Sequence, residues 1–135
     1  MDLEISQREK DGVVIVDLKG RLIGGDPVHA LREKLTGMAS VGNKSIILNL
    51  AGVDYIDSSG LGSMVIIYTG VKKHCGMVKL LNLSKRNVEL LVLTKLTTVF
   101  EVFDDEQNAV NSFFPNREIK RFDILSFLQN QKESE

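Results

Sequence analysis

Residues 54–65 read DYIDSSGLGSMV. This stretch joins the end of an apolar strand pattern to the start of an apolar helix pattern, which begins near Ser59. Gly60 and Gly62 lie in the expected first turn of the helix, where each glycine costs about 1 kcal/mol relative to alanine. The turn therefore indicates a backbone that must stay small and open, either for close packing inside the domain or for the approach of another molecule.

Ser58 and Ser59 have two interpretations at this position. Either hydroxyl can cap the helix by accepting a hydrogen bond from a backbone N–H two or three residues further on. Two hydroxyls are more than one cap requires, so the second interpretation is that one serine is open to a modifying enzyme such as a kinase. The open turn around Gly60 and Gly62 would give such an enzyme access.

Other chemistries at the turn are less well supported. The free N–H groups of a helix N-terminus can bind phosphate, so a nucleotide-binding domain is an alternative, but no lysine follows the glycines as it does in a P-loop. A nucleophilic serine would need a histidine base, and His74 lies about 20 Å away at the far end of the same helix. His74 and Cys75 have no third metal ligand in view. We expect no enzyme activity, no cofactor and no metal.

The composition is that of an ordinary globular protein. The chain has 135 residues, 43% of them hydrophobic and 26% charged, which suits one domain. A net charge of −1 argues against a nucleic-acid partner, and the only cysteine, Cys75, rules out an internal disulfide. We find no signal-peptide pattern and no apolar run near the roughly 18 residues of a membrane span, so we expect a cytoplasmic protein without direct membrane insertion.

Strands and helices are expected to alternate along the chain. Two strands at 3–7 and 13–18 predict an N-terminal antiparallel hairpin, and three more strands are expected at 45–50, 77–81 and 97–100. Helices are expected at 27–39, 59–73, 85–93 and from about 105 to 113, with Asp26, and Asp104 or Asp105, as caps. Right-handed crossovers then give a mixed, mostly parallel sheet. The predicted fold class is α/β, with one domain over residues 1–114.

Residues 115–135 form an extension beyond this domain. Ile119, Phe122, Leu125 and Leu128 fall on one helical stripe, with Ile124 and Phe127 beside it, before a polar tail at 129–135. The first interpretation is a helix docked on the domain's own surface. The second is a helix that packs on a partner or on a second copy, which would make a homodimer through this segment.

The motif as a whole resembles a known signature. LNL at residues 48–50 followed by DYIDSSGLG at residues 54–62 resembles the signature of STAS domains, and within them that of the bacterial anti-sigma-factor antagonists. The resemblance runs from about residue 4 to residue 112, in the order of elements as well as in the motif. It implies a STAS-like fold and a regulatory binding protein.

The resemblance also implies a phosphorylation switch. The serine directly after the aspartate, here Ser58, would be the phosphorylated residue, in a turn supported by Asp57, Ser59, Gly60 and Gly62. The partner would be an anti-sigma factor that is also a serine kinase. The unphosphorylated antagonist would bind this kinase, the phosphorylated form would release it, and a phosphatase would reset the switch.

The chain departs from the family pattern after the second strand. Family members often carry Gly-Glu-Leu-Asp there, whereas this chain has GRLI at residues 20–23. We expect Arg21, Ile23, Asp26 and Leu61 at the partner surface, with a partner specificity that differs from that of typical members. STAS domains also act as scaffolds of signalling assemblies and as accessory subunits of membrane transporters, and the apolar extension favours this alternative.

Overall fold

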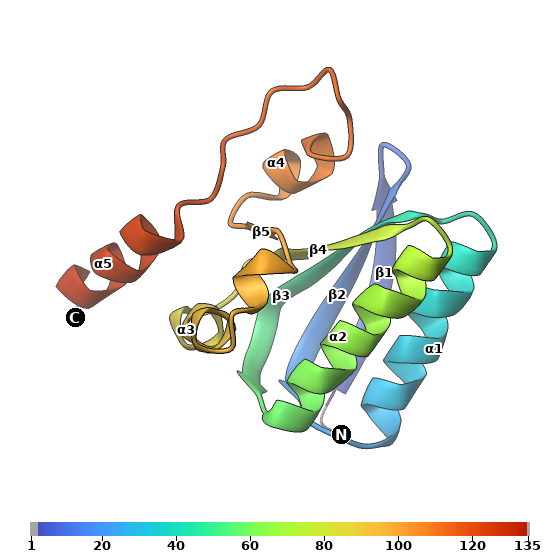
Figure 1. Cartoon of the computed structure of the whole chain (residues 1–135), viewed down its shortest axis with the longest axis horizontal. Coiled ribbons are helices and arrows are strands. Elements are labelled where there is room, and N and C mark those ends of the chain that lie inside the picture. Colours follow the sequence, from blue (N-terminus) through green and yellow to red (C-terminus); the bar gives the residue numbers. More distant parts are fainter. Residues whose placement is uncertain (1–2, 135) are drawn as a thin grey trace.

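The computed structural model describes residues 3–134 and has a five-stranded sheet in the order β1-β2-β3-β4-β5 (Figure 1). The elements are β1 (Leu3–Lys10), β2 (Val13–Leu22), α1 (Asp26–Ser40), β3 (Ser45–Ile56), α2 (Ser58–Lys73), β4 (Met77–Leu81), α3 (Lys85–Leu93), the short 3-10 helix η1 (Leu96–Thr98), β5 (Val102–Phe103), α4 (Glu106–Asn111) and α5 (Ile124–Ser134). Strands β1 and β2 pair antiparallel, and the other neighbours pair parallel. The predicted mixed α/β fold with an N-terminal hairpin is confirmed.

The two faces of the sheet bury different groups of side chains. Every crossover from β2 onward steps in the same direction, so right-handed connections place α1, α2 and α3 on one face, where α1 and α2 lie side by side (Figure 1). Ile46 and Leu48 of β3 point into the main core on that face, whereas Ile47 points to the opposite face and packs with Ala109 and Val110 of α4. The continuous apolar run of β3 is therefore buried on both sides.

Two expectations about the strands are wrong. Residues 51–56, expected as a connection, continue β3 to Ile56. Residues 97–100, expected as a strand, contain the end of η1, and the last strand is β5. Phe100 of this segment packs in the core instead of joining a strand ladder: it is buried, and its ring meets that of Tyr68 edge-on at 5.3 Å.

The extension docks on its own domain, beside α3 (Figure 1). The expected stripe from Ile119 to Leu128 does not form, because α5 begins only at Ile124. Apolar side chains from this segment pack against the main core at Phe122, Ile124, Phe127 and Leu128, whereas Ile119 packs against the second cluster. Leu125 is 76% exposed. Of the expected polar tail, Glu135 lies outside the described residues.

Candidate functional site

Asp57, not a serine, caps α2. Its backbone is extended, and its side-chain Oδ1 accepts a hydrogen bond from the N–H of Gly60 at 2.7 Å. Its carbonyl accepts from the N–H of Leu61 at 2.9 Å, the first bond of the helix. The first of the two interpretations, that Ser58 or Ser59 caps the helix, is therefore wrong. Both serines are exposed, and neither hydroxyl is needed to start the helix.

The turn contacts the end of β2 through the backbone of Leu22. The N–H of Asp57 donates to the Leu22 carbonyl oxygen at 3.1 Å. Gly60 lies so close to the same carbonyl that a Cβ added to it would be 1.9 Å from the oxygen. At Gly62 an added Cβ would meet nothing within 4 Å. Close packing therefore explains Gly60 and does not explain Gly62.

The loop between β2 and α1 lies beside the serines. Strands β2 and β3 are parallel, so their carboxyl ends meet at the same edge of the sheet, and a Cβ added to Gly24 would be 3.0 Å from the Cβ of Ser59. Asp26 does not cap α1 as expected: Gly25 holds the cap position at φ 128°, and Asp26 is the first helical residue. Its exposed carboxylate still lies at a helix N-terminus, where negative charge is favourable.

The residues expected at the partner surface divide into two groups. Arg21, Ile23 and Asp26 lie at the edge of the sheet that carries the turn, Arg21 and Asp26 exposed and Ile23 half-buried. Leu61 is only 7% exposed and belongs to the main core with Met64, three residues further along α2. Leu61 therefore anchors the first turn of α2 and cannot offer its side chain to a partner.

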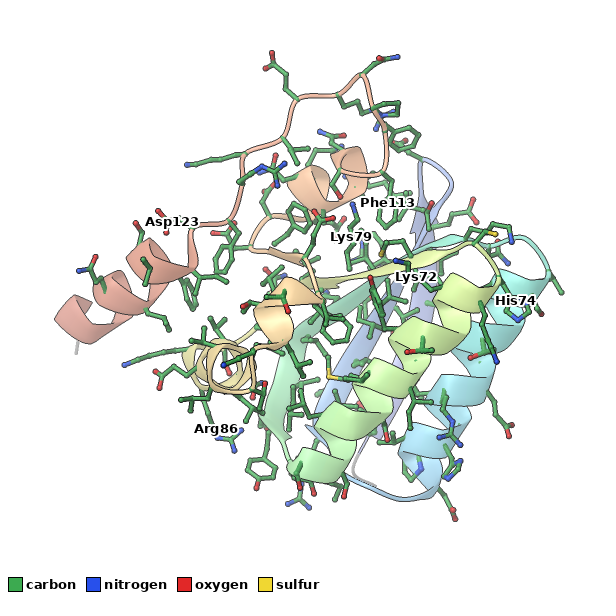
Figure 2. All side chains as sticks on the ribbon, viewed as in Figure 1. Lys72, His74, Lys79, Arg86, Phe113 and Asp123 are labelled. Carbon is green, nitrogen blue, oxygen red and sulfur yellow. The ribbon has the colours of Figure 1, made fainter. Side chains whose placement is uncertain are left out.

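Two residues that were not among the predicted site residues also lie at the edge of the sheet that carries the serine turn. Tyr55 is 39% exposed and pairs with Arg21 across β2 and β3. The guanidinium carbon of Arg86, from α3, lies 4.2 Å from the centre of the Tyr55 ring, and Arg86 extends from α3 toward the junction of β3 and α2 (Figure 2). An aromatic residue two positions before Asp57 was a usable sequence signal for Tyr55. No local pattern links Arg86 to the motif.

The titratable groups with clearly shifted pKa values lie elsewhere. Arg8 donates hydrogen bonds to Asp17 and to Glu106, and these bonds are the main reason that the pKa of each carboxyl group lies below its ordinary value. The same bonds raise the pKa of Arg8. This cluster links side chains of β1, β2 and α4 and contains none of the residues of the serine turn.

Within residues 3–134, no group of three or more His, Cys, Asp and Glu side chains is arranged to hold a metal ion. In the same part of the chain, no helix combines the length and the hydrophobicity that a membrane crossing requires.

Comparisons with known proteins show which family the chain belongs to. The STAS domain family matches residues 4–109, so the extension lies outside the matched range. The chain is 32% identical over 111 residues to the anti-sigma-B factor antagonist of Bacillus subtilis (strain 168). The matched region covers 82% of this chain and 99% of the relative. The chain is also 27% identical over 112 residues to the anti-sigma F factor antagonist of Paenibacillus polymyxa, covering 82% of this chain and 94% of that one.

Solved structures agree in fold. The structure of the anti-sigma factor antagonist SpoIIAA in its unphosphorylated form matches with a TM-score of 0.70 and 20% identity, covering 85% of this chain and 100% of that one. The Bacillus cell fate determinant SpoIIAA in its phosphorylated form matches with a TM-score of 0.63 and 22% identity, covering 82% and 99%. With its serine turn at the carboxyl edge of a five-stranded sheet and a family match over most of its length, the chain belongs to the STAS domain family.

Proposed function

We propose that this protein is an anti-sigma factor antagonist, a regulatory binding protein rather than an enzyme, which binds an anti-sigma factor with serine kinase activity and is released when Ser58 is phosphorylated. The observation that carries the proposal is the capping of α2 by Asp57, which leaves the Ser58 side chain exposed at the start of the helix. The names of the relatives support the same role. A phosphatase would restore the binding form, and a supply of ATP for the kinase would place the cycle in the cytoplasm.

The physical basis of the switch is a balance between two electrostatic effects. A phosphate on Ser58 would add about −1.5 to −2 charges, and at a helix N-terminus each unit is favourable by about 0.3–1 kcal/mol. A thousandfold loss of affinity needs about 4 kcal/mol, and burying a charged group without a cationic partner costs several kcal/mol per ion. Asp57, the preceding residue, adds like-charge repulsion. The domain would therefore stay folded while docking fails.

The test is direct phosphorylation. We would incubate the full chain with ATP, Mg²⁺ and each candidate anti-sigma factor kinase of the same genome, and locate any added phosphate by mass spectrometry. We expect it on Ser58, and none on a Ser58→Ala variant. Phosphate on Ser59 with Ser58 untouched would contradict the site assignment.

A binding measurement completes the test. Ser58→Asp should weaken binding to that kinase and leave the circular dichroism spectrum and the melting temperature nearly unchanged. Ser59→Asp is the matched control, because it puts the same charge one residue further along the helix, beside Gly24. If the Ser58→Asp variant binds as tightly as the wild type, the electrostatic basis of the switch is wrong.

A second candidate function is a scaffold or an accessory subunit of a signalling assembly or a membrane transporter. The observation that favours it is an apolar patch where α3 meets α5: Leu93 is 80% exposed and Leu125 76% exposed, and Val92 and Leu128 line a groove with Leu93. A homodimer through the extension would use the same patch. Co-purification discriminates between the candidates, because a kinase partner supports the first and a transporter subunit or a large homomeric assembly the second.

A further inference from the structure

We infer that Tyr55 and Arg86 together form an anchor through which the unphosphorylated protein holds an acidic side chain of its kinase partner. This inference rests on the proposed function and names the binding chemistry of the same surface. Arg86 lies outside the STAS signature and Tyr55 lies within its DYIDSSGLG segment, but neither residue is part of the serine turn from Asp57 to Gly62.

The position of Tyr55 places its ring beside the serine turn. Tyr55 is the second-to-last residue of β3 and lies three residues before Ser58. The last residue of the strand, Ile56, is 1% exposed and points into the main core. Side chains alternate along a strand, so the Tyr55 ring points away from that core, and it is 39% exposed. A large aromatic side chain at the rim of the sheet therefore offers apolar area to a visiting protein next to the exposed serine.

Arg86 holds this ring in place. Its guanidinium carbon lies 4.2 Å from the ring centre, and its Nη1 donates to Oδ1 of Asn87 at 3.2 Å. Asn87 is fully buried, and its own Nδ2 donates to the carbonyl of Val53, on the same strand as Tyr55, at 3.4 Å. These contacts link the ring and the guanidinium to the buried Asn87 before any partner arrives, which would lower the entropy cost of binding.

The chemistry of a stacked guanidinium selects the partner group. Arginine has five N–H donors in one plane, and stacking on a ring occupies its face while leaving the donors at its edge. The described contacts of Arg86 use one of these donors, toward Asn87. A carboxylate fits the remaining edge and can accept two parallel hydrogen bonds. Tyrosine and arginine are also the residue types that most often carry interface affinity.

The charge at the turn restricts where a partner acid can bind. Asp54 and Asp57 lie on either side of Tyr55 in the sequence, and both carboxylates would repel an acidic group, so the favourable place for a partner's carboxylate is against the Arg86 guanidinium. A phosphate on Ser58 has the same sign as the partner's carboxylate. Phosphorylation would then repel the group that the anchor holds, in addition to the cost of burying the phosphate itself.

The test compares stacked arginines at two places on the fold. Arg86→Gln and Tyr55→Ala remove the two parts of the anchor, and Arg86→Lys keeps the charge without the planar edge. Arg117→Gln is the matched control, because Arg117 stacks on the Phe114 ring at 4.0 Å in the same way but belongs to the extension. The dissociation constant of each unphosphorylated full chain would be measured against the kinase that phosphorylates the wild type, at low and high salt.

We expect Arg86→Gln and Tyr55→Ala each to weaken binding about tenfold or more, Arg86→Lys to weaken it less, and Arg117→Gln to leave it unchanged. The association rate of Arg86→Gln should depend less on salt than that of the wild type. If the wild type binds and the Arg86 variants bind equally well, the inference is wrong and the proposed function stands. If the wild type binds none of the candidate kinases, both are wrong.

Discussion

Replacing Gly60 with alanine should destabilise the protein, although alanine is the better helix former. The added Cβ would lie 1.9 Å from the carbonyl oxygen of Leu22 and 2.6 Å from its carbonyl carbon. Real Cβ contacts with other atoms are essentially never shorter than 3.0 Å, so α2 and the end of β2 would have to separate by about 1.1 Å, from 1.9 Å to 3.0 Å. Both contacts are to backbone, which cannot rotate away as the end of a flexible side chain can.

The magnitude follows from three contributions. Alanine gains about 1 kcal/mol over glycine inside a helix. Forcing extra volume into a packed site costs about 1–3 kcal/mol. The same movement weakens the hydrogen bond from the Asp57 N–H to the Leu22 carbonyl, which contributes about 1 kcal/mol. The net effect is a destabilisation of about 2 kcal/mol, which lowers the melting temperature of a domain of this size by about 5–10 °C.

The assay is urea denaturation followed by circular dichroism, with Gly62→Ala as the control. Gly62 lies in the same turn of the same helix, and its added Cβ would meet nothing, so this variant should gain up to about 1 kcal/mol. The two variants should thus change stability in opposite directions. A Gly60→Ala protein as stable as Gly62→Ala would refute the reasoning. If Gly62→Ala is stable but no longer binds its partner, the open backbone at this position serves docking.

Three further changes test the rest of the fold. Asp57→Ala should cost about 1 kcal/mol of unfolding free energy through loss of the α2 cap, and Asp57→Asn, which keeps an acceptor, should cost less; equal losses in urea denaturation would contradict the cap. Arg8 lowers the pKa of Asp17 and of Glu106, so the stability that it contributes is present above their unfolded-state values and is lost as the pH falls through the lower folded-state values. Arg8→Gln should therefore be less stable than the wild type near pH 7 and differ little at about pH 2, and a difference that grows toward acid would have the wrong sign. Deleting residues 115–135 should leave a folded domain with a lower melting temperature, because this segment packs against the main core; a chain that fails to fold would show that the extension is part of the domain.

The regular part of the fold was predictable because its patterns are unambiguous. The run of β3 is apolar at Ile46, Ile47 and Leu48 in succession, which is typical of a strand covered on both faces. The buried residues of α2 recur at helical spacing from Leu61 to Val71. Each pattern agrees with the turn residues on either side of it, so local and tertiary preferences coincide.

The C-terminal part was less predictable because apolar residues there satisfy more than one pattern. Residues 97–100 look like a strand, but Phe100 lies in the main core and Val99 packs against it next to η1. In the extension, a stripe from Ile119 and a stripe from Ile124 are both helical in spacing, and the sequence does not say where the helix begins. The contact with α3 selects the second stripe, and such a contact between segments remote in sequence has no local signal.

The cap of α2 shows how a tertiary contact decides between equal local choices. Asp57, Ser58 and Ser59 are all good capping residues, so propensity alone cannot rank them. The backbone bond from Asp57 to Leu22 holds Asp57 in an extended conformation at the edge of the sheet and makes it the last residue before the helix. Asp57, as the cap, and Gly60, which packs against Leu22, are therefore the residues that stabilise this turn. Ser58 is needed neither for the cap nor for core packing, so a charged group can be added to it at little cost to the fold, which is the property that a phosphorylation switch requires.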